Sequence, residues 1–345
     1  MERLGDLYFE LSNEDRLNIL TIIEETPMKL TGLSKELGIT NQECSRHLTR
    51  LLEAELTRKG SDGLYHLTPF GELSLRMRVG QLFTVKHREY FNTHTLKRLP
   101  QEFVVRIGEL GDCIRTSNIT LAFFYIEKVI REANEYLWEM ADQYLVNTFP
   151  LRNEALRREV KLKSINSRGL VFPKQVREWY RAQPELVEVG DKARSTGIIE
   201  ERLLDGTDVF LCMSEKEGIV AFPLPDGGFD YLGFTSTEGG FHKWCGDLFD
   251  FHWERARSRA SIVEELYDWV KGRPRAVDVL NCIATEKEVT TGDKIIPELE
   301  SKGLIEDGML TLVGEIVHSW VVQKSSDRPI DFSRYWAIVY KEKKG

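Results

Sequence analysis

Residues 37–51, with the sequence LGITNQECSRHLTRL, form the pattern that most restricts how this chain can fold. Thr40 and Glu43 have the spacing of a capping box, in which each side chain accepts a hydrogen bond from a backbone amide of the other residue. Apolar residues then recur at the spacing of one helix face: Cys44, Leu48, Leu51 and Leu52. The pattern predicts a helix that opens at Thr40 and packs through a single buried stripe.

The opposite face of this predicted helix carries short polar and basic side chains. Amide groups suit the edge of adenine, guanidinium groups suit guanine or phosphate, and hydroxyl groups suit either, so such a face can contact the major groove. The face comprises Asn41, Gln42, Ser45, Arg46, Thr49 and Arg50. We expect these residues, with Thr40 at the helix start, to bind DNA.

The flanking segments predict the rest of a winged helix-turn-helix. A dense apolar helix covers residues 17–23, and a short helix precedes the capped one. Residues 56–67 are typical of two strands joined by an Asp-Gly turn. In this fold the second helix of the pair enters the major groove, and Arg58 and Lys59 in the wing would support DNA binding.

The charge of the chain leaves a second interpretation of this domain open. The formal net charge is −8, but only the surface that meets the groove must be positive. Residues 44–60 contain more basic than acidic side chains: Arg46, Arg50, Arg58 and Lys59 against Glu53 and Glu55. The alternative is a winged helix that contacts proteins of the transcription machinery without reading bases.

Composition limits the class of protein and its ligands. A chain of 345 residues predicts two or three domains, and 41% hydrophobic with 30% charged residues is typical of a soluble globular protein. No apolar run reaches the roughly 18 residues of a membrane span, and the acidic start does not resemble a signal peptide. The scattered cysteines have no zinc spacing. We therefore expect a cytoplasmic protein without membrane contact, metal or cofactor.

Residues 276–322 contain a second, weaker copy of the winged-helix pattern. Three of its segments match segments of the first copy: residues 278–283 match 18–23, 299–304 match 51–56, and 310–315 match 67–72.

The second copy is shortened where the first would read DNA. From Leu20 to Leu51 is a step of 31 residues, whereas from Leu280 to Leu299 is a step of 19, so twelve are absent. Pro297 would interrupt the helix that corresponds to the reading helix, unless it lies in the first turn. We expect a degenerate winged helix that serves packing or dimerisation.

Residues 100–257 alternate helix and strand patterns, which predicts an α/β domain. A long helix is predicted over residues 123–145, and an amphipathic helix over residues 244–253. Short strands are predicted over residues 161–165, 186–189, 209–213, 218–224 and 229–234.

Several segments resemble archaeal transcriptional regulators. ELSNEDRLNIL, LSKELGITNQECSRHLTRL and LYHLTPFGEL resemble the N-terminal winged helix of ArsR-like and sugar-regulator-like proteins. EYFNTHTLKRLPQEFVVRIGEL, residues 89–110, resembles the junction of the methanogenesis-regulator family, and YLGFTSTEGGFHKWCGDLFDFHWERA, residues 231–256, resembles the end of its middle domain. The resemblance spans residues 8–257 and implies a phospholipase-D-like middle domain that senses an effector.

The residues of the middle region argue against catalysis. Phospholipase-D-like enzymes use a His-x-Lys motif with a distant Asp, where the histidine is the nucleophile. This chain has His94-Thr-Leu-Lys97 and His242-Lys243, but no His-x-Lys. P-loop, Gly-x-Ser-x-Gly and HExxH motifs are also absent from the sequence. We expect a protein that is not an enzyme, with no catalytic residue.

One stretch of the middle region is basic. Residues 152–181 contain nine Lys or Arg against three Glu. Such a run is often only a solvated face, but it could also bind a phosphorylated or carboxylated effector, or flanking DNA phosphates. The candidate residues for this anion site are Lys161, Lys163, Arg168, Lys174 and Arg177.

These patterns together predict an α/β multidomain protein with three parts. A winged helix-turn-helix with a linker helix covers residues 1–95, an α/β effector-sensing domain covers residues 96–260, and the degenerate winged helix covers residues 261–345. The predicted function is a sequence-specific transcriptional regulator that binds a double-stranded operator as a homodimer and responds to a small anionic effector.

Overall fold

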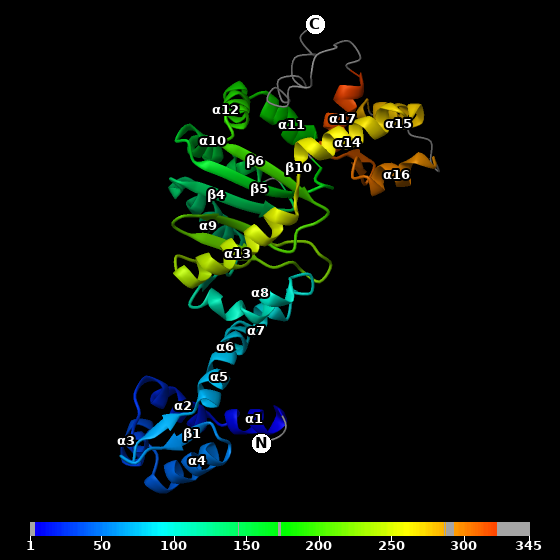
Figure 1. The fold of residues 1–345 in the computed structure, drawn as a ribbon. Coiled ribbons are helices and arrows are strands. Elements are labelled where there is room, and N and C mark those ends of the chain that lie inside the picture. The colour runs from blue at the N-terminus through cyan, green and yellow to red at the C-terminus, as the bar shows by residue number, and fades with distance from the viewer. Residues whose placement is uncertain (1–3, 144, 172–173, 286, 288–292, 323–345) are drawn as a thin grey trace. The chain divides into compact units, whose positions relative to one another are not determined.

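A computed structural model describes residues 4–143, 145–171, 174–285, 287 and 293–322 (Figure 1). The chain divides into two compact units, residues 1–87 and 88–345. The domain boundaries at residues 95 and 260 stay predictions. Within the described part of the chain, no helix is long and apolar enough to cross a membrane.

The N-terminal unit has the predicted element order of a winged helix-turn-helix. Its elements are α1 (Leu4–Leu11), α2 (Glu14–Glu25), α3 (Leu30–Leu37), α4 (Asn41–Glu53), β1 (Thr57–Lys59), β2 (Tyr65–Leu67), α5 (Pro69–Met77) and α6 (Val79–Lys86). Ile19 and Leu20 of α2, Leu33 of α3, and Leu48 and Leu51 of α4 are at most 1% exposed and form one core. Burial of these apolar side chains supplies most of the stability of the three-helix arrangement.

The second unit is built on an eight-stranded sheet with the strand order β10-β6-β5-β4-β7-β8-β9-β3. Its strands are β3 (Ile114–Arg115), β4 (Tyr136–Ala141), β5 (Lys161–Ser167), β6 (Ile199–Leu204), β7 (Phe210–Ser214), β8 (Gly218–Ala221), β9 (Phe234–Ser236) and β10 (Arg257–Ser258). The pairs β4–β5 and β5–β6 are parallel, and the remaining pairs are antiparallel. The sheet confirms the predicted α/β fold class of this region.

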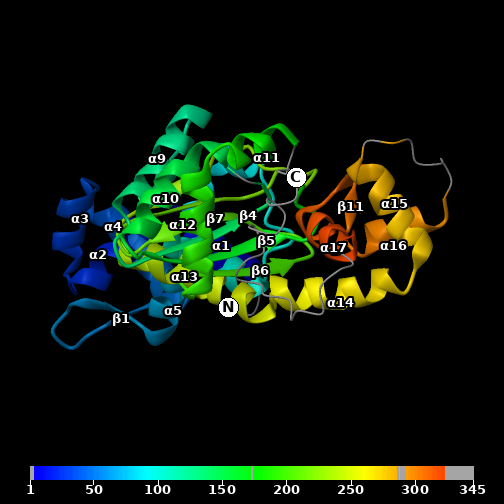
Figure 2. The same ribbon diagram turned by 90° about the horizontal axis from the view of Figure 1, so that it is seen from above.

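Helices cover both faces of this sheet (Figures 1 and 2). On one face lie α9 (Ile119–Glu132), α10 (Phe149–Arg157) and α12 (Pro184–Ser195), and on the other lies α13 (Gly239–Arg255). The remaining short helices of this region are α7 (Arg88–Phe91), α8 (Gln101–Val105), η1 (Ile107–Leu110), η2 (Val146–Thr148) and α11 (Lys174–Arg181).

Two predicted elements of the middle region are wrong. The helix predicted over residues 123–145 ends at Glu132, and the chain continues as β4, because the Glu215 carboxylate accepts hydrogen bonds from the amides of Asn134 and Glu135 at 3.0 and 3.2 Å. The strand predicted over residues 186–189 lies inside α12. Pro184 occupies the first turn of that helix, where its missing amide hydrogen costs nothing.

The other predicted strands are found in whole or in part. Residues 161–165, 209–213 and 218–224 fall largely on β5, β7 and β8, whereas the strand predicted over residues 229–234 begins only at Phe234. The predicted amphipathic helix is the core of α13.

The C-terminal part of the second unit contains the predicted second winged helix. It consists of α14 (Arg259–Lys271), α15 (Pro274–Ala284), α16 (Ile295–Ser301), β11 (Ile305–Glu306), β12 (Met309–Leu310) and α17 (Leu312–Val322). Pro297 is the third residue of α16, so it lies in the first turn, where a proline is tolerated and the helix continues.

The two copies share a close backbone contact at the helix that follows the wing. Thr68 caps α5 by accepting from the Gly71 amide at 3.0 Å, and Thr311 accepts from the Gly314 amide at the same distance. A Cβ at Gly71 would lie 2.1 Å from the Leu56 carbonyl oxygen, and a Cβ at Gly314 would lie 1.8 Å from that of Leu304. Only glycine fits so close to a carbonyl, and the repeat is therefore structural as well as sequential.

The second residue after α4 provides a test of this equivalence. Glu55 has a left-handed φ of 58°, and its equivalent in the second copy is Gly303, with φ of 67°. A left-handed non-glycine residue costs roughly 1 kcal/mol, so Glu55→Gly should raise the free energy of unfolding of the N-terminal unit by about that amount. The measurement is hydrogen exchange of α4 amides in the full chain. As a control, Glu53→Gly at the last residue of α4, where the backbone is still helical, should lower the same free energy by up to about 1 kcal/mol; equal losses in both variants would contradict the assignment.

Candidate nucleic-acid interface

The start of α4 is fixed by the predicted capping box. The Glu43 amide donates to the Thr40 hydroxyl at 3.2 Å, and the Thr40 amide donates to the Glu43 carboxylate at 3.0 Å. The hydrogen bond from the Thr40 backbone lowers the pKa of Glu43, so this carboxylate stays charged at neutral pH. A negative charge in the first turn also favours the helix dipole.

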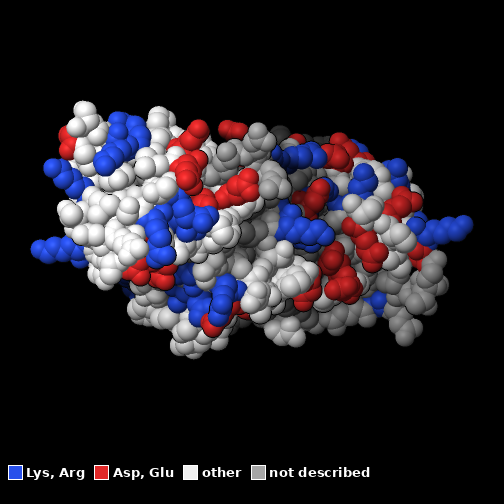
Figure 3. Space-filling model, turned by 90° about the horizontal axis from the view of Figure 1, so that it is seen from below, with Lys and Arg blue, Asp and Glu red and all other residues white. Residues whose placement is uncertain are grey.

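Burial gives α4 the two faces that the sequence predicts. Cys44, Leu48 and Leu51 are at most 1% exposed, and the proposed DNA-binding residues lie on the exposed side. Those exposed residues are Thr40, Asn41, Gln42, Ser45, Arg46, Thr49 and Arg50. In Figure 3, the N-terminal unit at the left presents separate groups of Lys and Arg side chains on a surface that is otherwise mostly uncharged.

Three of these side chains are available to an external ligand. Gln42, Ser45 and Arg46 make no side-chain hydrogen bond or ion pair with other described residues, and their spacing places them on the first two turns of one face. We call Gln42, Ser45 and Arg46 the α4 trio. They can bind an external group without breaking an internal bond.

Two other predicted residues have local partners. The side-chain carbonyl of Asn41 accepts a hydrogen bond from the Ser34 hydroxyl at 2.6 Å, which joins α4 to α3 across the turn. The Thr49 hydroxyl donates to the Ser45 backbone carbonyl at 2.9 Å. Asn41 keeps its amide donors for other contacts, whereas the Thr49 hydroxyl already uses its proton.

Arg50 is held by α1, a contact that sequence analysis missed. Its Nε and Nη2 donate to the two oxygens of Glu10 at 3.0 and 2.6 Å, and its guanidinium lies 5.0 Å from the centre of the Phe9 ring. Arg16 also pairs with Glu10, at 3.2 Å. We call Glu10, Arg16 and Arg50 the α1 clasp. The hydrogen bond from Arg50 lowers the pKa of Glu10, so the clasp persists at neutral pH and breaks only as the pH falls below the ordinary value of 4.5.

The wing places its two predicted basic residues in solvent. Arg58 and Lys59 are exposed on β1, where they pair in register with His66 and Tyr65 of β2. The Lys59 ammonium lies 5.4 Å from the centre of the Tyr65 ring. Because both side chains are exposed on the same strand, their charges can contact DNA phosphates.

The described side chains of the predicted anion site do not come together. Lys161 is exposed, and Lys163 lies over Trp253 of α13, 5.0 Å from the ring centre. Arg168 pairs with Asp205 at 3.1 Å and donates to the Lys302 carbonyl at 3.0 Å, which ties the sheet to the second winged helix. The side chains of Lys174 and Arg177 lie outside the described residues. The anion site stays a prediction.

The α1 clasp generates a prediction about DNA affinity. Glu10→Gln should release Arg50 and remove a negative charge beside α4, so binding to duplex DNA should tighten severalfold. The dependence of affinity on salt should also steepen by about 0.9 per released phosphate contact. Fluorescence anisotropy at several salt concentrations measures both.

The matched control for this charge change is Glu24→Gln. Glu24 is an exposed acid near the end of α2. A general electrostatic effect would change the affinity equally in both variants and would contradict a specific role of the clasp.

Comparison with known proteins gives one domain assignment. A helix-turn-helix domain family matches residues 11–59, from the end of α1 to the end of β1. Among solved structures, that of TrmBL2, described as an archaeal chromatin protein with a novel mode of DNA binding, is similar. It is 15% identical, covers 71% of this chain and 94% of its own, and has a TM-score of 0.33. No curated protein matches the chain. The N-terminal unit thus contains a helix-turn-helix domain.

Proposed function

We propose that this protein is a sequence-specific DNA-binding transcriptional regulator. The observation that carries the proposal is the α4 trio, because Gln42, Ser45 and Arg46 project from the capped second helix of a helix-turn-helix without hydrogen bonds or ion pairs to other described side chains. These are side chains that recognise base edges and phosphates in the major groove. Arg58 and Lys59 supply backbone contacts from the wing.

The second unit is proposed to sense an effector rather than to catalyse a reaction. A cavity of about 110 Å³ between the sheet and two covering helices supports binding of a small molecule. The histidine of the junction, His94, stacks on Tyr90 with ring centres 3.7 Å apart and contacts Asp230 at 3.2 Å, so packing explains its presence. With the sequence resemblance, these features favour an archaeal regulator of the methanogenesis-regulator type that acts in the cytoplasm.

The second winged helix is proposed to pack, and not to read DNA. In the alignment of the two copies, Arg50, Arg58 and Lys59 correspond to Glu298, Glu306 and Asp307. All three acids are exposed. Three cations of the first copy are thus replaced by anions, which would repel phosphates.

A homodimer is proposed on the basis of exposed apolar residues of the N-terminal unit. Leu73 and Met77 of α5 are 55% and 74% exposed, and Leu82 and Val85 of α6 are 52% and 69% exposed. Exposed apolar residues gathered on neighbouring helices are typical of an interaction surface. A second copy is the partner that also explains specificity, because two reading helices recognise two half-sites.

Removal of the Arg46 guanidinium tests DNA reading. A duplex selected from random sequence by the wild-type protein serves as the ligand, and Arg46→Ala should weaken its binding about 10- to 100-fold, equivalent to about 1–3 kcal/mol for a base contact. Affinity for an unrelated duplex should fall less. Anisotropy titrations measure both.

The control is Arg131→Ala, which removes an exposed guanidinium from α9 of the second unit. It should leave operator affinity unchanged. Unaltered affinity in Arg46→Ala, or the failure of selection to enrich any sequence, would instead favour a factor that contacts the transcription machinery.

Dimerisation has a separate test. Leu73→Glu combined with Met77→Glu places charges on the exposed stripe of α5, so it should convert a dimer to a monomer in sedimentation experiments. Asp6→Lys, a charge change on α1 outside that stripe, should leave the sedimenting mass unchanged. A wild-type protein that sediments as a monomer bound to a single half-site would contradict the proposal.

A further inference from the structure

Strand register places three polar side chains in one row on the central sheet. Glu139 of β4 is opposite Ser164 of β5, and Ser164 is opposite Glu201 of β6. Adjacent strands are about 4.8 Å apart, so the two carboxylates flank the serine at a separation of roughly 10 Å across the sheet. Asn166 follows two residues later on the same face of β5 and donates to the Ser164 hydroxyl at 3.3 Å.

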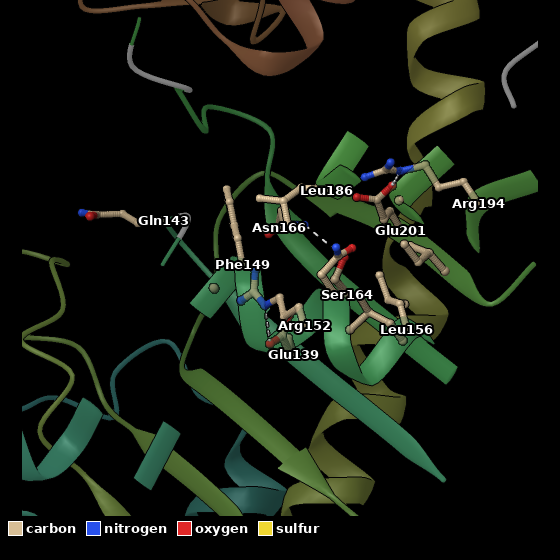
Figure 4. Close-up of a pocket in the computed structure, with 15 residues that line it drawn as sticks. Glu139, Gln143, Phe149, Arg152, Leu156, Ser164, Asn166, Leu186, Arg194 and Glu201 are labelled. Carbon is tan, nitrogen blue, oxygen red and sulfur yellow. Dashed lines mark hydrogen bonds and ion pairs between the residues drawn. The ribbon is translucent and has the colours of Figure 1, made fainter. Parts of the chain in front are cut away.

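Two helices cover this row and border a partly open cavity of about 110 Å³ (Figure 4). Arg152 of α10 donates through Nε to Glu139 at 3.0 Å, and Arg194 of α12 donates through Nε to Glu201 at 3.1 Å. Figure 4 shows the two ion pairs on different walls of the cavity, with Ser164 between them. Phe149, Leu156 and Leu162 add apolar surface.

The charges that line the cavity are already balanced. Two carboxylates face two guanidinium groups, and all four side chains are at most 18% exposed. Burial raises the pKa of Glu139 despite Arg152. Burial also acts to raise the pKa of Glu201, but Arg259 and Arg194 together hold it below its ordinary value. A ligand with a net charge would have to compete with a buried ion pair, which is strongly unfavourable.

The hydrogen-bonding groups suit hydroxyls. Each ion pair presents guanidinium donors beside carboxylate acceptors, and a hydroxyl group can accept from the one and donate to the other. Ser164 and Asn166 offer the same two functions on the floor of the cavity. At roughly 10–15 Å³ per water position, the cavity has room for about seven to eleven non-hydrogen atoms.

We propose that this cavity binds a small, uncharged, polyhydroxylated molecule. This ligand class specifies the effector of the proposed response. Its regulatory role rests on that proposed function, whereas the binding itself is inferred from the cavity alone. The charge balance favours a neutral ligand over the anionic effector expected from sequence.

Glu201 connects the cavity to the second winged helix. Its carboxylate accepts from Arg194 in the cavity and also from Arg259, the first residue of α14, at 3.1 Å. Arg259 and the cavity residue Arg194 therefore share the Glu201 carboxylate. A ligand that draws Arg194 or Glu201 toward itself would change the contact that holds the start of α14 to the sheet.

Three four-carbon probes test the ligand class. Calorimetric titration of the full chain with threitol, tartrate and 1,4-diaminobutane compares an uncharged polyol with a dianion and a dication. Threitol should bind saturably and at least about tenfold more tightly than either charged probe, because each of those would leave an extra charge in a balanced site. Tighter binding of a charged probe, or no saturable binding of threitol, would overturn the proposal.

Paired variants on β5 test whether threitol binds in the cavity. Ser164→Val removes a hydroxyl and fills part of the cavity, so threitol affinity should fall more than about tenfold. Ser167→Val makes the same change on the opposite face of the strand and should not alter it. Leu156→Phe, which fills the cavity from α10, is the second test if Ser164→Val unfolds. Equal threitol affinity in wild type and a folded cavity variant would overturn the proposal.

These titrations contain no DNA, so their outcome does not depend on the proposed DNA-binding function. Failure of the regulator proposal would appear instead in the Arg46→Ala titration.

Discussion

Burial of Cys44, Leu48 and Leu51 fixes the rotation of α4, and the functional account depends on that rotation. A helix that turned by one residue, about 100°, would bury polar groups and expose leucines. The capping box fixes the start of the same helix. Together the stripe and the cap determine that Gln42, Ser45 and Arg46 face outward on the first two turns, where a groove-binding helix makes its base contacts.

The two winged helices show which parts of the module are scaffold and which are function. Both keep a threonine cap and a glycine pressed against a carbonyl, because the close approach of helix to wing leaves no space for a side chain. The surface charge, in contrast, differs between the two copies, since basic positions of the first copy are acidic in the second. The same backbone geometry can therefore carry a surface that attracts phosphate and one that repels it.

Local patterns made much of the fold predictable. The capping box, the apolar stripe of α4 and the element order of both winged helices depend on residues close in sequence, and the structure has them where expected. The overlong helix over residues 123–145 had a different origin. Its end is set by hydrogen bonds that the Glu215 carboxylate, some 80 residues away, accepts from the backbone, and no local pattern contains them.

Long-range contacts were also what sequence analysis missed in the candidate sites. Arg50 lay on the correct face of α4, but its pairing with Glu10 joins residues 40 positions apart. The cavity row of Glu139, Ser164 and Glu201 depends on the register of three strands. Its local signal was limited to Glu139, a carboxylate within the apolar strand β4 that a partner must stabilise, whereas Glu201 lies between the charged residues Glu200 and Arg202 of β6 and does not stand out. The basic run over residues 152–181 instead predicted an anion site, and the described side chains of that site do not lie together.

The central claim is that α4 of the first winged helix binds DNA and that the second winged helix does not. Hydrogen exchange of the full chain, with and without a duplex selected by the protein, compares the two copies in one experiment. The account predicts slower exchange over α4 and the β1–β2 wing on binding DNA, with no change over α16 and the β11–β12 wing. Protection confined to the second copy, or absent from α4, would contradict it.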